Sequence, residues 1–233
     1  MKNIILISFF IVFLSRNRST NEISTDSNLN EFDRTRVQDK SSLELDFGFR
    51  ITLGGEESYG DYKTYTSLKL KRENNTIFSD NSLIEYEFKN EKFPYVLKTG
   101  ENKFEILFEI NNRPNKNYLK RLFIQDNRVV GEDKLPILIS KAIDINNDGT
   151  KELAGFWDYA QTCGQNNNLT AYNPILYYEI TKTGFKLDSS MTKERNKKIY
   201  GEFHGLKFSE KFEQSSKVLE NFNSELELIH GKK

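Results

Sequence analysis

The fold class is first indicated by the stretch Leu45-Asp46-Phe47-Gly48-Phe49-Arg50-Ile51, in which an apolar side chain stands at every second position. Neighbouring side chains of a β-strand point to opposite faces, so this alternation is typical of a strand that buries one face. Gly54-Gly55 follows and ends the run, because glycine pairs favour turns. The stretch therefore predicts an antiparallel strand with one face on a core.

The same pattern recurs outward from this stretch along most of the chain. Turn-forming pairs such as Asn74-Asn75, Asp126-Asn127 and Thr183-Gly184 separate the runs. Further strands are expected at residues 62–71, 83–88, 95–98, 104–110, 118–125, 128–130, 136–143, 153–159, 174–181 and 185–187, with a weaker strand or pair at 199–208. Short strands with close turns predict a mainly β fold, an antiparallel meander with a propeller-blade-like sheet.

The C-terminal segment carries two competing patterns. The apolar residues from Val218 to Ile229 fall near helical spacing, which favours a C-terminal helix over residues 216–231. Leu226 and Leu228 alternate with glutamates as they would in a strand, so a strand is the alternative.

The composition favours a polar, soluble body with β-sheet surfaces. Hydrophobic residues make up 36% of the 233 residues and charged residues 29%, with a mean hydropathy of -0.66. The 18 Phe and 11 Tyr favour strands over a helical bundle. Lysine plus arginine equals aspartate plus glutamate at 34 each, so the chain lacks the positive field that attracts nucleic acid. We therefore expect no nucleic-acid partner.

The N-terminus has the composition of an export signal. Lys2 precedes an apolar run at residues 4–14, which is shorter than the about 20 residues that span a bilayer but fits a secretory signal. Val12-Phe13-Leu14-Ser15 resembles the lipobox of bacterial lipoprotein signals, although Arg16 stands where that family has its lipidated cysteine. We expect export to the periplasm, cell surface or extracellular space, without lipidation. An uncleaved N-terminus lying at the membrane interface is the alternative.

These patterns divide the chain into three regions. Residues 1–15 are signal-peptide-like, and we expect membrane contact through this segment alone. Residues 16–42 have too few apolar side chains to offset the entropy of ordering them, so we expect a disordered polar tether. Residues 43–233 are expected to form a single β-rich domain.

The stretch Asp144-Ile145-Asn146-Asn147-Asp148-Gly149-Thr150-Lys151-Glu152 has the composition of a cation-binding loop. Side-chain oxygens recur at alternate positions, and Gly149 allows the positive-φ turn that keeps the chain curling. Calcium takes six to eight oxygens at about 2.3–2.6 Å in such loops. We predict a structural calcium site with the affinity of extracellular modules, about 10⁻⁴–10⁻³ M. Its ligands would be Asp144, Asn146, Asp148, the carbonyl of Thr150, and Glu152.

This pattern is similar to the strand-loop-strand calcium sites of FG-GAP and VCBS-type repeats. Their shared sequence is Asp-x-Asp/Asn-x-Asp-Gly-x-x-Asp/Glu, with flanking aliphatic residues that are Ile143 and Leu153 here. The loop occurs once, so the resemblance implies a metal-binding turn between strands rather than a whole propeller. An EF-hand is excluded, because the twelfth loop position is Gly155 and Pro136 precedes the loop in a β-like segment.

A simpler interpretation needs no metal. Asp148-Gly149 alone would make a tight hairpin turn. That interpretation leaves Asp144 and Glu152 without a role, and three carboxylates in one empty loop repel one another. Metal would therefore mainly stabilise the turn.

Other residues support competing interpretations. The acidic loop 56–61, with Glu56, Glu57 and Asp61, is either a carboxylate pair for glycoside hydrolysis or a solvated turn. Cys163, the only cysteine, is either a nucleophile with His204 as base or a half-buried thiol. His204 and His230 lack metal-ligand spacing, and we expect both at the surface or at a sheet edge.

Two clusters of side chains have both a functional and a packing interpretation. The aromatic cluster either forms a platform for sugar or peptide or packs the face of the sheet. It contains Trp157, Tyr159, Tyr172, Tyr177 and Tyr178. The basic cluster is expected in a solvated loop. It contains Lys193, Arg195, Lys197 and Lys198, interrupted by Glu194.

The sequence predicts an exported, non-enzymatic binding or structural module of the cell envelope with one structural calcium loop. Its partner would be an envelope, glycan or protein ligand. The alternative is a secreted hydrolase of glycans or peptides that uses the acidic loop or Cys163. A third class is an inhibitor or immunity protein.

Overall fold

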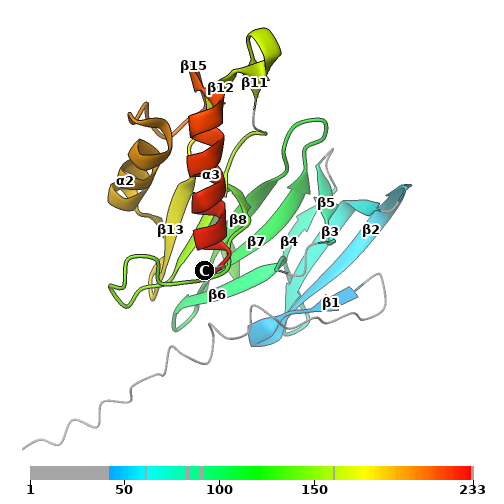
Figure 1. The fold of residues 1–233 in the computed structure, drawn as a ribbon. Helices are drawn as coiled ribbons and strands as arrows, with labels where there is room; N and C mark the ends of the chain where they lie inside the picture. Colours follow the sequence, from blue (N-terminus) through cyan, green and yellow to red (C-terminus); the bar gives the residue numbers. More distant parts are fainter. Residues whose placement is uncertain (1–41, 61, 82–83, 90–91, 160, 232–233) are drawn as a thin grey trace, which may run out of the picture. The chain divides into compact units, whose positions relative to one another are not determined.

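The computed structural model describes residues 42–60, 62–81, 84–89, 92–159 and 161–231 (Figure 1). All of them belong to one of two contact units, Phe32–Lys233. The signal-peptide-like segment 1–15 lies outside the described residues, as does the tether 16–42 except for Ser42. No helix in the described part combines the length and the apolar composition that crossing a membrane requires.

The described residues form mainly strands, with two α-helices. The strands are β1 (Ser42–Glu44), β2 (Phe49–Tyr59), β3 (Tyr62–Arg72), β4 (Asn75–Asp80), β5 (Glu85–Glu87), β6 (Tyr95–Gly100), β7 (Lys103–Asn111), β8 (Tyr118–Gln125), β9 (Arg128–Leu138), β10 (Glu152–Phe156), β11 (Thr162–Cys163), β12 (Leu169–Tyr172), β13 (Leu176–Thr181), β14 (Gly184–Leu187) and β15 (Ser209–Gln214). The helices are α2 (Ser189–Tyr200) and α3 (Ser215–Ile229), with short 3-10 turns η2 (Asp46–Gly48) and η3 (Gln165–Asn167). The predicted mainly β fold and the C-terminal helix are confirmed.

Most strands belong to one antiparallel sheet. Its order is β1-β2-β3-β5-β7-β8-β9-β10-β13-β14, with β4 paired to β3 and β6 paired to β7. A second, three-stranded sheet has the order β11-β12-β15. Neighbours along the first part of the large sheet are mostly neighbours in sequence, as a meander requires.

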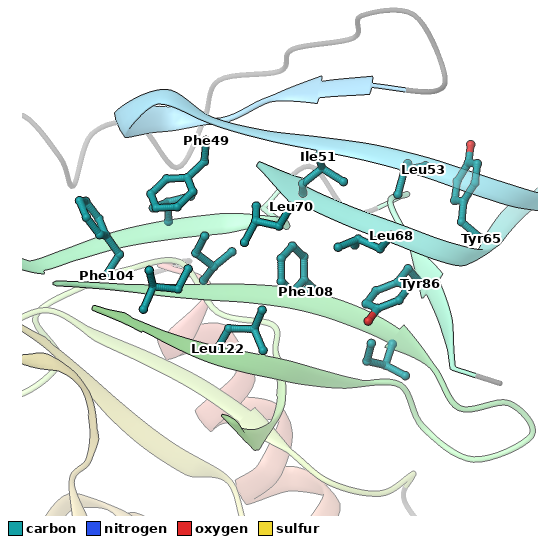
Figure 2. Packing of buried hydrophobic residues seen from close by; sticks show 14 residues of the cluster. Phe49, Ile51, Leu53, Tyr65, Leu68, Leu70, Tyr86, Phe104, Phe108 and Leu122 are labelled. Atoms are coloured by element: carbon teal, nitrogen blue, oxygen red, sulfur yellow. The ribbon is translucent and has the colours of Figure 1, made fainter. Parts of the chain in front are cut away.

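The first core lies between strands of the same sheet. Phe49, Ile51 and Leu53, at alternate positions of β2, are all buried in it, which confirms the strand expected at Phe49–Ile51. The first half of the predicted strand is wrong, because residues 46–48 form η2, and so is the predicted turn at Gly54-Gly55, which lies within β2. Figure 2 shows side chains of β2 and β3 facing those of β7 and β8, with Phe104 and Phe108 on the opposite side. The sheet therefore curves so that its own strands enclose this core.

The second core lies between the sheet and the helices. Helix α3 contacts α2, β12 and β15, and α2 contacts β13 (Figure 1). The core residues come from the loop before β10, from β10, β12 and β13, from the segment between β12 and β13, and from both helices. They are Ile145, Ala154, Tyr172, Ile175, Tyr177, Met191, Ile199, Tyr200, Val218 and Ile229.

A buried charged contact fastens the β13–β14 hairpin to the large sheet. Arg121 Nη1 donates to the carbonyl of Phe185 at 2.8 Å, and Glu105 Oε2 accepts from the Phe185 amide at 3.1 Å. Gly184 lies so close that an added Cβ would stand 1.9 Å from Glu105 Oε1. Arg121 also donates to both carboxylate oxygens of Asp133. The hairpin is thus held through its backbone, which requires a residue without a side chain at position 184.

Helix α2 differs from the sequence-based expectation. The basic cluster was predicted in a loop and residues 199–208 as a strand, and both predictions are wrong. The buried face of α2 includes the polar Thr192 and Asn196 as well as Met191 and Ile199, so its apolar periodicity is weak. Its start is conventional, because Asp188 Oδ1 accepts a hydrogen bond from the Met191 amide at 2.9 Å.

Several strands also depart from their expected bounds. Strand β9 runs unbroken from 128 to 138 where two strands were predicted, and it contains Pro136. From 139 to 143 only Ile143 makes a bridge. Strands β4, β12 and β15 stand where turns, a loop or no element was expected. Polar side chains in these strands hide the alternation that marks a half-buried strand.

We expect Gly184→Ala to lower the free energy of unfolding by roughly 1–3 kcal/mol, because its Cβ would displace the Glu105 carboxylate. The matched control is Gly205→Ala, since Gly205 has a similar φ of 108° against 119° and no atom within 4 Å of an added Cβ. Chemical denaturation of both variants measures the difference. Equal losses would show that backbone strain alone accounts for Gly184.

Candidate metal site

The predicted cation loop connects β9 to β10. At its base, the Ile143 amide donates to the Glu152 carbonyl at 3.2 Å and the Glu152 amide donates to the Ile143 carbonyl at 2.8 Å. This reciprocal pair closes the loop as an antiparallel bridge. The residues between these two are therefore held as a compact turn.

Side-chain oxygens inside the turn accept from its own backbone amides. Asp144 Oδ1 accepts from the Asp148 amide at 3.1 Å, and Asp144 Oδ2 accepts from the Gly149 amide at 2.9 Å. Asp148 Oδ1 accepts from the Thr150 amide at 2.8 Å. Asn147 and Gly149 have φ values of 61° and 88°, so the backbone is in the left-handed region at both positions. These contacts hold the carboxylates inward.

The structure brings three of the five predicted ligands together. One oxygen each of Asp144, Asp148 and Glu152 lies within 4.8 Å of the other two. Asn146 is exposed, and its Nδ2 donates to Asp148 Oδ2 at 2.7 Å. Thr150 is half-buried and contacts Asp148 through its amide. Ligation by any of the five residues stays a prediction.

Ile145 anchors the loop in the second core. It stands between Asp144 and Asn146 in the sequence, is 9% exposed, and packs in the cluster that contains Met191 and Ile229. Its amide donates to Glu152 Oε2 at 2.8 Å. The same residue therefore couples the acidic cluster to the packing beneath α2 and α3.

Glu152 is the electrostatic centre of the site. Its side chain is fully buried, and burial raises the pKa of its carboxyl group to about 7. The Ile145 amide opposes this shift, whereas the negative charges of Asp148, Asp144 and Asp188 add to the rise in the Glu152 pKa. Asp188, the residue that caps α2, lies far from the loop in sequence, so no pattern in the loop pointed to it.

Glu152 differs from the other buried glutamates of the described residues in having a buried carboxylate oxygen without a partner. Its Oε1 is buried without a hydrogen-bond donor. Glu87 pairs with Arg113, Glu105 with Arg121, Glu109 with Asn117, and Glu225 with Tyr177 and Arg195. A buried carboxylate oxygen without a donor is costly, and either protonation of Glu152 or a bound cation would reduce that cost.

Two of the acids proposed for hydrolysis, Glu56 and Glu57, lie in strand β2 rather than in the predicted loop. Glu56 pairs with Lys63 and Glu57 accepts from Tyr59, on the exposed end of the β2–β3 hairpin. Asp61, the third acid of this loop, lies outside the described residues.

Cys163 and His204 form no hydrogen bond with each other in the described part of the chain. The Cys163 thiol is half-buried, as the second interpretation predicted. His204 Nδ1 lies 3.2 Å from the Lys211 ammonium. The His204 and Tyr172 rings pack edge to face, with centroids 5.1 Å apart. A cysteine–histidine pair is therefore without structural support.

The aromatic cluster divides into buried and exposed members. Tyr172, Tyr177 and Tyr178 are buried and pack in the interior, so they form no platform. Trp157 is half-buried and Tyr159 is 51% exposed. Of the five residues in this cluster, only those in the segment after β10 therefore carry an aromatic ring that a ligand can reach.

No protein-family model, no curated protein and no solved structure matches this chain. The similarity of the loop to FG-GAP and VCBS-type repeats therefore stays a resemblance of the loop sequence.

In the metal-free protein we expect stability to fall as pH rises. The Glu152 pKa is near 7 in the folded state and 4.5 ordinarily, so folding favours the protonated carboxyl group. Its contribution to the free energy of unfolding is therefore fully present below pH 4.5 and is lost as pH rises through 7. From about pH 5 to pH 8 the loss should be about 2–3 kcal/mol. Denaturation with chelator present measures it.

The comparison variant is Glu152→Gln, which keeps the acceptor for the Ile145 amide and carries no charge. Its unfolding free energy should change less over this pH interval. Glu101→Gln, at an exposed turn, should follow the parent. Parallel pH profiles for the parent and Glu152→Gln would contradict the assignment.

Proposed function

We propose that this chain is an exported, non-enzymatic binding or structural module of the cell envelope, whose fold is completed by one calcium ion. The apolar run at residues 4–14 supports export. The loop from Asp144 to Glu152 supports the ion. The partner would be an envelope component, a glycan or a protein.

The observation that carries the metal assignment is the unpartnered Oε1 of Glu152. Acidic clusters at a surface are common without a metal, because water and salt screen their charges. Glu152 is buried, however, and the charges that act most strongly on it are carboxylates. A cation would neutralise three converging acids and occupy the place of the absent donor.

The donor set favours calcium over other biological metals. The candidate ligands are oxygens of carboxylate, amide and carbonyl groups, which suit hard cations. Zinc prefers histidine and cysteine ligands, and the acidic cluster contains neither. Oxygens on opposite sides of one calcium ion stand about 4.6–5.2 Å apart, and the three carboxylate oxygens lie within 4.8 Å.

The ion's role would be structural. Asp144, Asp148 and Glu152 would hold it, with Asn146 and Thr150 as further ligands. Bound calcium supplies positive charge and fixes the curl of the loop. Ile145 would then stay in the second core, and the Lys141 amide would keep its hydrogen bond of 3.3 Å to the carbonyl of Ile229 at the end of α3.

The hydrolase alternative has less support. Glu56 and Glu57 are already paired at an exposed hairpin, and the Cys163 thiol has no hydrogen bond to a base in the described residues. Assays on glycan and peptide panels with Glu57→Ala and Cys163→Ala test it. Turnover by the parent that either substitution abolishes would establish the hydrolase.

We expect calcium at about 10 mM to raise the free energy of unfolding by about 1–3 kcal/mol, because this concentration exceeds the expected dissociation constant about 10- to 100-fold. Asp148→Asn keeps the acceptor for the Thr150 amide and removes one ligand charge, so its calcium effect should be much smaller. Thermal melting of the full chain, with calcium and then with chelator, measures both.

The control is Asp126→Asn, at an exposed turn between β8 and β9, which should respond to calcium as the parent does. Identical melting curves for the parent with calcium and with chelator would remove the ion from the proposed function.

A further inference from the structure

A second group of side chains gathers at the end of β10 opposite the metal loop. It consists of Lys116 from the β7–β8 connection, Phe156 at the end of β10, and Asp158 and Tyr159 just beyond it. We name these four residues the Tyr159 patch. None of them belongs to the acidic loop or to the predicted calcium ligands.

The aromatic part of the patch is exposed but held in place. Tyr159 is 51% exposed, and the Lys116 ammonium lies 5.0 Å from the centre of its ring and 4.4 Å from that of Phe156. The buried Asn173 donates through Nδ2 to the carbonyl of Asp158 at 2.7 Å. Phe156 packs against Phe222 of α3, with ring centres 5.7 Å apart. The Tyr159 ring therefore stands on a supported segment.

The polar part of the patch holds a donor and an acceptor that do not satisfy each other. The Lys116 ammonium has no hydrogen bond or ion pair among the described residues, and burial lowers its pKa. The Asp158 carboxylate likewise has no such partner there, although its charge acts on Lys116. By contrast, the neighbouring Arg113 is fixed on Glu87 by two hydrogen bonds, of 2.7 and 3.1 Å.

We propose that the Tyr159 patch binds a neutral glycan. The apolar face of a sugar ring would stack on the exposed Tyr159 ring, as apolar C–H groups pack on aromatic faces. One sugar hydroxyl would accept from Lys116, and another would donate to Asp158. This inference rests on the binding role proposed above and names the class of ligand.

The charges of the patch favour a neutral sugar over an acidic one. Lys116 and Asp158 offset each other, and the nearby Glu109 adds negative charge. A polyanion would be attracted by Lys116 but repelled by both Asp158 and Glu109. A neutral ligand with many hydroxyls can satisfy a donor and an acceptor at once.

The experiment uses the full chain and the fluorescence of Trp157, the one tryptophan in the sequence, which adjoins Asp158. Dextran, mannan, xylan and N-acetylchitooligosaccharides are titrated as neutral probes, with polygalacturonate as the acidic probe and a peptide mixture as the third arm. We expect saturable binding of at least one neutral probe, confirmed by affinity electrophoresis.

Tyr159→Ala should weaken this binding by about tenfold or more, since aromatic contacts are worth about 1 kcal/mol beyond the area that they bury. Lys116→Ala and Asp158→Asn should each weaken it as well. Lys134→Ala is the matched control, because Lys134 lies 4.6 Å from the centre of the Tyr118 ring outside the patch. It should bind as the parent does.

Binding of no neutral probe, binding of polygalacturonate or peptide alone, or unchanged binding by Tyr159→Ala would each overturn the assignment. The calcium-dependent melting shift of Tyr159→Ala should equal that of the parent. A failure of glycan binding is thereby distinguished from a failure of the calcium assignment.

Discussion

A carboxylate that is buried away from water needs a hydrogen-bond or charged partner. The rest of the fold depends on how this requirement is met at strand β7. Seven consecutive residues of β7 are buried, so both of its faces are covered. One face supplies Phe104 and Phe108 to the first core, whereas the other carries Glu105 and Glu109. Glu105 meets its requirement by accepting from the Phe185 amide and pairing with Arg121. The charge that would destabilise the sheet in isolation thus fastens the β13–β14 hairpin to it.

The same constraint explains why the metal loop stands out within the protein. Glu152 is as deeply buried as the paired glutamates, yet its nearest charged neighbours are acids. Protonation and cation binding are the two ways to relieve such a site, and they compete for the same oxygen. Because Ile145 packs in the second core from within the loop, either solution acts on the helices as well as on the turn. Strand β10 begins at this site and ends at the Tyr159 patch, so one short, buried strand supports both proposed binding functions.

Sequence reasoning located the strands where apolar and polar residues alternate and missed elements where they do not. The alternation at Phe49 and Ile51 marks β2, because one face of that strand meets a core and the other meets solvent. The apolar periodicity of helix α2 is weak, because Thr192 and Asn196 lie on its buried face. Their side chains accept hydrogen bonds from the backbone of β13 and of the segment before it. The acidic loop was recognisable because its spacing is local. Asp188 and the Tyr159 patch were not, because their members come from separate parts of the chain.

What the sequence determined by itself is local in character. It specified a mainly β meander, a C-terminal helix and a curl of acids whose backbone geometry depends on Gly149 and its neighbours. Tertiary structure alone decided which charges are buried and with what partners. Glu152 and Glu101 are equivalent as residue types, but folding buries one among carboxylates and leaves the other in water. The free energy of a charge depends on its surroundings, and those surroundings exist only once distant strands have packed.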